Sequence, residues 1–196
     1  MEENKLTFTG ELFLRDEHIQ TQLYSQTFSE RVVSIHMKTY FKRVEEKDFI
    51  QECSFTISPA GYIRAEFNST MHGESVTMRI RKINNNKLEI YFNSVIKEII
   101  EVNDNEIVLL DGPSPIFDYY NYMYFVNSQD GENVERKIFQ IECLHGKLLK
   151  KNYIYQKNGD TINIQKDEAT VSIKFWEGSY NLKKIITKDT VCFFNR

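Results

Sequence analysis

Few side chains in this sequence are spaced for catalysis. Cys143 and His145 stand two apart on an expected strand, so a thiol and an imidazole would share one face. At that spacing the side chains lie about 7 Å apart, too far for a direct hydrogen bond, and no third residue is placed to orient the imidazole. We therefore interpret the pair as structural and assign no catalytic residue.

Two carboxylates flank an expected helix start. Asp111 and Asp118 lie where free backbone N–H groups favour negative charge. The simplest role for both is to stabilise the helix and the turn before it. Catalysis by a carboxylate pair is the alternative.

Metal and cofactor signatures are missing. His18, His36 and His72 lack His-x-x-x-His spacing, and the sequence contains no glycine motif that cradles phosphate. Cysteine occurs three times without a Cys-x-x-Cys pair, as expected of small buried thiols in a reducing compartment. We predict no metal site, no cofactor and a cytoplasmic location.

An aromatic tract is the densest candidate binding feature. Four of the eleven tyrosines and two of the fourteen phenylalanines fall between Phe117 and Phe125. Ser114 followed by Pro115 predicts a helix start, because serine can cap backbone N–H groups and proline suits the first helical position. The helix predicted over 115–126 is apolar on nearly every side, so it should plug a core. Its tyrosine hydroxyls need partners, which favours the mouth of a cavity.

Four aromatic residues are predicted to line that cavity. Three lie on the expected helix, and the fourth is the sole tryptophan, at the end of the run VSIKFW, where packing or a groove rim are the two interpretations. The predicted ligand-binding residues are Phe117, Tyr120, Tyr124 and Trp176.

The elements around the tract alternate with the period of half-buried strands. In the stretch Val33–Phe41, alternate residues from Val33 onward are mainly apolar and should face the core. Asn158-Gly159 between two alternating runs predicts a tight hairpin. Further predicted core positions on the next strands are Phe49, Cys53, Phe55, Ile57, Ile63, Ala65, Phe67, Val76, Met78, Ile80, Leu88, Ile90 and Phe92.

The strand count constrains the architecture. About a dozen strands follow one another without a linker, and a twisted open sheet of more than about ten strands must curl, close or split. We therefore predict one domain over 1–196 that is mainly β. It should be a single curled antiparallel sheet, a half-barrel or β-roll, wrapped around one central helix near 115–126.

Charge and hydropathy exclude several classes of partner. The net charge of −3 provides no basic field for nucleic acid. The N-terminal segment opens with two glutamates and alternates, unlike a secretory signal. Uncharged apolar stretches are too short for a transmembrane segment.

The order of elements, two meanders on either side of the helix segment DGPSPIFDYYNY, resembles a known architecture. It is similar to the curved half-barrel of bacterial lipoprotein carriers and of related proteins assigned to glycolipid binding. The resemblance implies an unclosed sheet around a helix, with a groove for an apolar or lipid-like ligand.

Three functional classes follow. The leading one is a non-enzymatic intracellular protein that binds a small apolar or lipid-like ligand on the concave face of the sheet. It should contain a cavity of about 300 Å³ or more. The second is an assembly subunit with a filled core, such as a homodimer. The third is an enzyme, in which Asp111, Asp118 or His145 would meet another titratable group in a cleft.

Overall fold

The computed structural model describes most of the chain, with short gaps between the described segments. Within them, fifteen strands form one sheet, and the only helical segment follows β9. The predicted mainly-β class and single curled sheet are confirmed, with fifteen strands in place of about a dozen. The described residues are 4–28, 32–41, 50–71, 74–84, 86–103, 107–112, 114–142, 146–167, 169–179 and 181–195.

The first eight strands form an antiparallel meander in which each strand pairs with the next. Their short connections keep neighbours in sequence adjacent in space. They are β1 (Asn4–Leu14), β2 (Glu17–Phe28), β3 (Val33–Phe41), β4 (Ile50–Ser58), β5 (Gly61–Met71), β6 (Glu74–Asn84), β7 (Lys87–Phe92) and β8 (Val95–Glu101).

The last seven strands form the second half of the sheet. They are antiparallel except for β9, which pairs with β10 in parallel. Because β1 also pairs with β15, both halves belong to one sheet whose outer strands are β8 and β9. The strands are β9 (Leu110–Asp111), β10 (Asn133–Glu142), β11 (Lys147–Asn158), β12 (Thr161–Lys166), β13 (Ala169–Phe175), β14 (Leu182–Ile186) and β15 (Thr190–Asn195).

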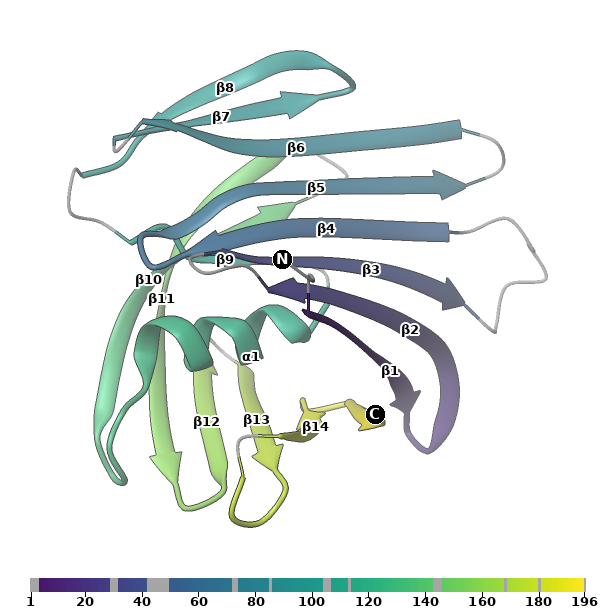
Figure 1. Ribbon diagram of the computed structural model, residues 1–196, viewed down its shortest axis with the longest axis vertical. Helices are drawn as coiled ribbons and strands as arrows, with labels where there is room; N and C mark the ends of the chain where they lie inside the picture. The colour runs from purple at the N-terminus through teal and green to yellow at the C-terminus, as the bar shows by residue number, and fades with distance from the viewer. Residues whose placement is uncertain are drawn as a thin grey trace.

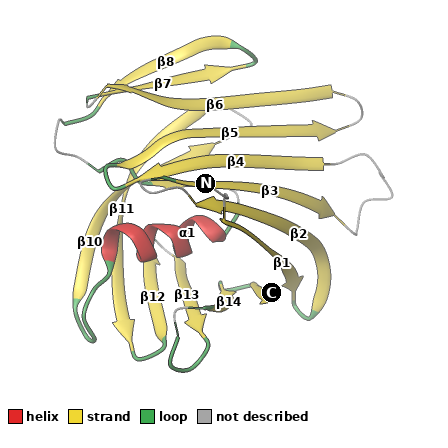
Figure 2. Cartoon of the chain, viewed as in Figure 1, coloured by secondary structure: helices red, strands yellow, loops and turns green. Residues whose placement is uncertain are grey.

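The sheet curls so strongly that its two halves cross. Figure 1 shows β3 to β8 running across the upper part of the view and β10 to β13 running downward, with the helix in the space that they partly enclose. In Figure 2 this helix is the one red element among the yellow strands. A sheet of this many strands buries one face by wrapping it around a helix.

The helix begins and ends with local backbone chemistry. α1 (Ile116–Asn121) continues directly into the π-helical segment η1 (Tyr122–Val126), which matches the predicted range. The backbone N–H of Ile116 donates to Ser114 Oγ at 3.3 Å, so the predicted serine satisfies a free donor at the helix start. The helix ends at Asn127, whose φ of 39° is left-handed.

Alternation predicted the buried face of most strands correctly. Val33, Ile35 and Met37 are all buried. Two predicted core residues, Val76 and Phe92, are only partly buried, and Phe49 lies outside the described residues. Ile63 is on the wrong face: the prediction placed it in the core, but it is 37% exposed, and its neighbour Tyr62 is buried instead. The register of β5 against β4 shifts there, leaving Ile63 as the extra residue of a bulge and reversing the alternation.

Candidate functional site

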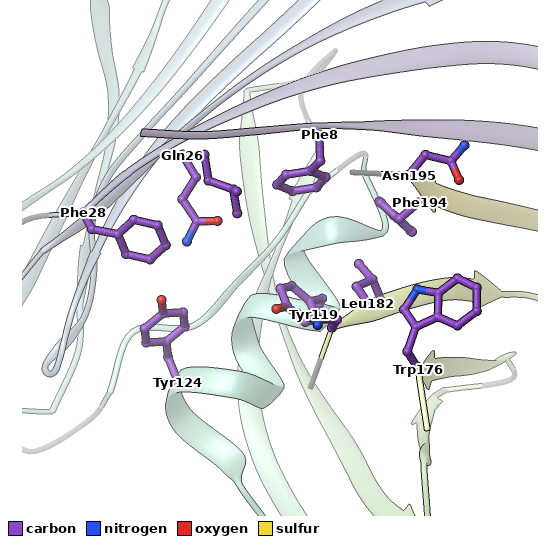
Figure 3. Close-up of a pocket in the computed structure, with 11 residues that line it drawn as sticks. Phe8, Gln26, Phe28, Tyr119, Tyr124, Trp176, Leu182, Phe194 and Asn195 are labelled. Atoms are coloured by element: carbon purple, nitrogen blue, oxygen red, sulfur yellow. The ribbon is translucent and has the colours of Figure 1, made fainter. Parts of the chain in front are cut away.

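A cavity of about 490 Å³ lies between the helix and the strands at the junction of the two halves of the sheet. Figure 3 shows its walls: β1 and β2 contribute Phe8, Gln26 and Phe28 on one side, and the helix contributes Tyr119 and Tyr124 on the other. Phe194 and Asn195 of β15 extend the wall next to β1, Trp176 and Leu182 lie beside the helix, and the remaining lining residues are Leu6 and Asn181.

The strand wall is built from inward positions of β1, β2 and β15. The ring of Phe8 stacks on Tyr24 with centroids 4.7 Å apart, and Phe194 lies 6.3 Å from Phe8. Such offset aromatic contacts stabilise the packed rings by more than the burial of their surface alone. The rings of the strand wall therefore pack against one another.

The helix wall is anchored to β2 by a buried hydrogen bond. Tyr120 donates from its hydroxyl to Gln26 Oε1 at 2.8 Å, and the Tyr120 and Tyr124 rings stack with centroids 6.1 Å apart. Tyr124 is 44% exposed, whereas Tyr120 is only 1% exposed. The same helix thus places one tyrosine in the core and another at the cavity mouth.

The outer rim of the cavity follows β13. Trp176 is 52% exposed, and the Lys183 Nζ atom lies 4.5 Å from the centre of its indole ring. A backbone hydrogen bond of 3.0 Å from Trp176 N–H to the Asn181 carbonyl closes the turn that carries both residues. The indole is therefore held at the opening while much of it stays accessible to solvent.

The structure brings two of the four predicted binding residues to this cavity. Tyr124 and Trp176 line it, but Phe117 and Tyr120 lie in the core and are not among the lining residues. Phe117 is fully buried, with its ring 4.5 Å from that of Phe55. A ligand-binding role for all four remains a prediction.

Sequence reasoning missed the polar residues of β2. Gln20, Gln22 and Gln26 alternate with a period of two and are all buried toward the helix. Gln22 Oε1 accepts hydrogen bonds from the hydroxyls of Tyr24 and Ser114, the latter at 3.3 Å. The period was visible in the sequence, but glutamine does not usually indicate a buried face.

A second cluster of side chains lies at the other end of the helix. The Lys166 Nζ atom lies 3.0 Å from Asp111 Oδ2 and 2.7 Å from Asp118 Oδ1. Tyr153 donates its hydroxyl proton to Asp111 Oδ2 at 2.6 Å. We call Asp111, Asp118, Tyr153 and Lys166 the ion cluster. It ties β9, α1, β11 and β12 together.

Burial sets the protonation of this cluster. It raises the pKa of Asp118 to about 7, although Lys166 opposes the rise. Burial alone would lower the pKa of Lys166, but the two carboxylates raise it above its usual value. Burial and the neighbouring Asp111 likewise raise the pKa of Tyr153. Asp118 is therefore a carboxyl group whose pKa lies close to neutral pH, because its burial outweighs the attraction of Lys166.

The ion cluster borders a smaller cavity of about 300 Å³, which is also lined by Gln20 and Gln140. Asp111 and Asp118 thus meet a titratable lysine beside a cleft, as the enzyme alternative requires. Asp118 lies in the first turn of α1, whereas Asp111 belongs to β9, ahead of the helix. A stabilising role for both aspartates at the helix start remains a prediction. The other candidates Cys143, His145 and His72 lie outside the described residues.

The described residues contain no group of three or more histidine, cysteine, aspartate or glutamate side chains placed to hold a metal ion. Among the same residues, no helix has the length and apolar character needed to cross a membrane.

Comparison with known proteins identifies fold neighbours only. No family model matches the sequence, and no curated protein matches it either. A DUF1089 family protein from Pseudomonas aeruginosa is structurally similar, with a TM-score of 0.56 and 10% identity over 82% of this chain and 86% of that one. A β-barrel-like protein of the domain of unknown function DUF1849 from Brucella abortus gives a TM-score of 0.49 and 7% identity over 98% and 94%. The DUF1089 likeness supports the curled sheet, but it does not establish the lipoprotein-carrier type.

Proposed function

We propose that this protein is a non-enzymatic, single-domain binding protein that holds a small apolar or lipid-like ligand in the cavity between the helix, β1, β2 and β14. The main support for this proposal is the cavity. Its volume of about 490 Å³ lies within the range of small-molecule sites, which are mostly apolar with a few polar groups that orient the ligand.

The lining chemistry favours an uncharged ligand. Most of the described lining residues are leucine, phenylalanine, tyrosine or tryptophan. The other three, Gln26, Asn181 and Asn195, carry side-chain amides. No charged side chain is among the described lining residues, so an ionised group would lose its hydration without gaining a partner. An apolar chain with a neutral polar end fits this lining best.

The arrangement of elements supports the same ligand class. The order of two meanders around a helix resembles that of lipoprotein carriers, which implies an apolar groove on the concave face. The cavity lies on that face and opens beside exposed aromatic side chains, Tyr124 and Trp176. This gives an apolar chain a route between solvent and the interior.

Titration with monodecanoylglycerol, a neutral single-chain lipid, tests the proposal. Trp176 is the sole tryptophan and lines the cavity, so its emission should shift to shorter wavelength as the lipid displaces water from the indole. Isothermal titration calorimetry on the same samples should give a saturable heat. Absence of both signals, at lipid concentrations below micelle formation, would contradict the proposal.

A matched pair of variants localises the binding. Phe28→Glu places a charge in the cavity wall and should weaken lipid binding by about tenfold or more. Tyr40→Glu places the same charge on β3, outside the cavity lining, at a residue of similar exposure: 41%, against 38% for Phe28. It should leave affinity within about twofold. Equal losses in both variants would place the ligand elsewhere.

A further inference from the structure

We propose that the smaller cavity beside the ion cluster is a second binding site, which takes a small primary amine that also carries hydroxyl groups. In this site Asp118 pairs with the ammonium of the ligand, and the amides of Gln20 and Gln140 bind its hydroxyl groups. The inference goes beyond the proposed function, because the described residues that line this cavity include none of those that line the larger one.

The first observation is an excess of negative charge at the smaller cavity. Among the described residues that line it, Asp111 and Asp118 are acidic and Lys166 is the one basic residue. Asp111 accepts a hydrogen bond from Tyr153 in addition to its ion pair with Lys166. Asp118 has no ion-pair partner besides Lys166 in the described part of the chain, and its side chain is only 2% exposed. With both aspartates ionised, a second ammonium would balance the charge of the lining.

The second observation is a buried amide without a hydrogen-bond partner. Gln20 lines the cavity and is only 7% exposed. Gln22 and Gln26, on the same face of β2, accept hydrogen bonds from the hydroxyls of Tyr24 and Tyr120, respectively. The side-chain amide of Gln20 forms no hydrogen bond to any described residue. A buried amide is costly unless it is hydrogen-bonded, so Gln20 points to a polar group of a ligand.

The third observation is the polar character of the remaining lining. Gln140, Thr187 and Thr190 are half-buried and line the same cavity. The two threonine hydroxyls lie 2.8 Å apart and bond to each other, whereas the Gln140 amide, like that of Gln20, has no hydrogen bond within the described segments. An amide both donates and accepts, as a hydroxyl does, so the two groups match.

The size of the cavity limits the ligand. Its volume of about 300 Å³ is at the lower end of the range of small-molecule sites. The larger cavity has no charged side chain among its described lining residues, whereas this one has three. The two cavities therefore suit different ligands, and the smaller one fits a short, charged and hydroxylated compound.

Saturation-transfer NMR near pH 8, where Asp118 is mostly ionised, tests the site with a matched pair of probes. Aminopropanediol is glycerol with one terminal hydroxyl replaced by a primary amine. The full chain should transfer saturation at least severalfold more strongly to aminopropanediol than to glycerol, because only the amine forms a charge-assisted hydrogen bond with Asp118. Equal transfer to both probes, or none to either, would overturn the proposal.

A matched pair of aspartate variants localises the amine. Asp118→Asn removes the excess charge of the cavity and should weaken aminopropanediol binding, measured from the concentration dependence of the transfer, by about tenfold. The control, Asp160→Asn, removes the same charge from the exposed turn between β11 and β12 and should leave affinity within about twofold. Equal losses would assign binding to the net charge of the chain and overturn the proposal.

Gln20→Leu tests the amide, and it does so even if Asp118→Asn does not fold. Leucine keeps most of the side-chain volume, and the midpoint of urea unfolding should not fall, because the amide has no hydrogen bond to lose. Aminopropanediol binding should weaken severalfold. A lower midpoint with unchanged amine binding would make Gln20 a structural residue and contradict the assignment.

Competition separates this site from the larger cavity. Aminopropanediol and monodecanoylglycerol should bind together, each with the affinity that it has alone, because the two cavities share no described lining residue. Displacement of the amine by the lipid would overturn the second site. Amine binding by a protein that does not bind the lipid would reject the proposed function and leave the second site standing.

Discussion

Two regions along the helix differ in how their side chains are buried and paired. At its start, the ion cluster holds Lys166 between two carboxylates, and the Asp118 side chain is only 2% exposed. Farther along the helix, the cavity that Tyr119 and Tyr124 line leaves Tyr124 and Trp176 about half exposed. One end fixes the helix to β9, β11 and β12 by charge and hydrogen bonds. The other leaves apolar surface uncovered, which is the condition for binding a ligand.

The difference explains how the fold can remain stable with exposed aromatic side chains at the cavity. Exposed aromatic surface lowers the stability that a core could otherwise supply, so a helix with an uncovered end needs other anchors. The ion cluster and the hydrogen bond from Tyr120 to Gln26 provide such anchors between the helix and the sheet. Apart from Gln26, which also lines the cavity, stability and binding are therefore assigned to different residues, which can be tested separately.

The sharpest test of this division compares two tyrosines on the same helix. Tyr120→Ala removes a fully buried ring and should lower the free energy of unfolding by about 3 to 5 kcal/mol. Tyr124→Ala removes a ring that is 44% exposed and should cost about 1 kcal/mol or less, while weakening lipid binding. Urea denaturation followed by circular dichroism measures both. Similar costs would erase the distinction between core and cavity.

Substitution of Lys166 tests whether the ion cluster anchors the helix. Lys166→Met leaves two buried carboxylates without their cation and should lower the free energy of unfolding by about 3 kcal/mol near pH 8. The control, Lys151→Met, breaks a pair with Asp167 whose side chains are 30% and 55% exposed and should cost at most about 1 kcal/mol. An equally small cost in both variants would mean that the ion cluster does not anchor the helix.

The pH dependence of stability tests the protonation of Asp118. Its folded pKa of about 7 lies above the ordinary value of 3.8, so the folded state holds a proton that the unfolded state releases between these values. Stability from this group is therefore lost as pH rises from about 4 to about 7, by about 1 kcal/mol per pH unit. The difference in unfolding free energy between wild type and Asp118→Asn isolates this slope. A difference that stays constant across the window would contradict the raised pKa.

The sheet could be predicted from the sequence because burial on one face imposes a period of two. That rule located the inner faces of β3, β4, β6 and β7, and it failed at Ile63, where a bulge changes the phase. The specific predicted strands began only at Val33 and left out β1 and β2. Mixed polar and apolar residues occupy the inner face of β2, so its period carried no clear apolar signal.

The site was harder to predict. Phe117, Tyr120 and Tyr124 share one face of an ideal α-helix, but the backbone becomes π-helical at Tyr122 and the α-helical period no longer applies beyond it. The meeting of Asp118 with Lys166 joins residues far apart in sequence. It depends on how far the sheet curls, which no local pattern specifies.

Native mass spectrometry of freshly purified protein, compared with its denatured mass, tests the central claim most directly. Our account predicts a monomer with a reproducible excess of a few hundred daltons that is lost on denaturation and is absent from the Phe28→Glu variant. The excess mass would identify the class of ligand. A bare wild-type mass that stays bare after incubation with monodecanoylglycerol would contradict the account.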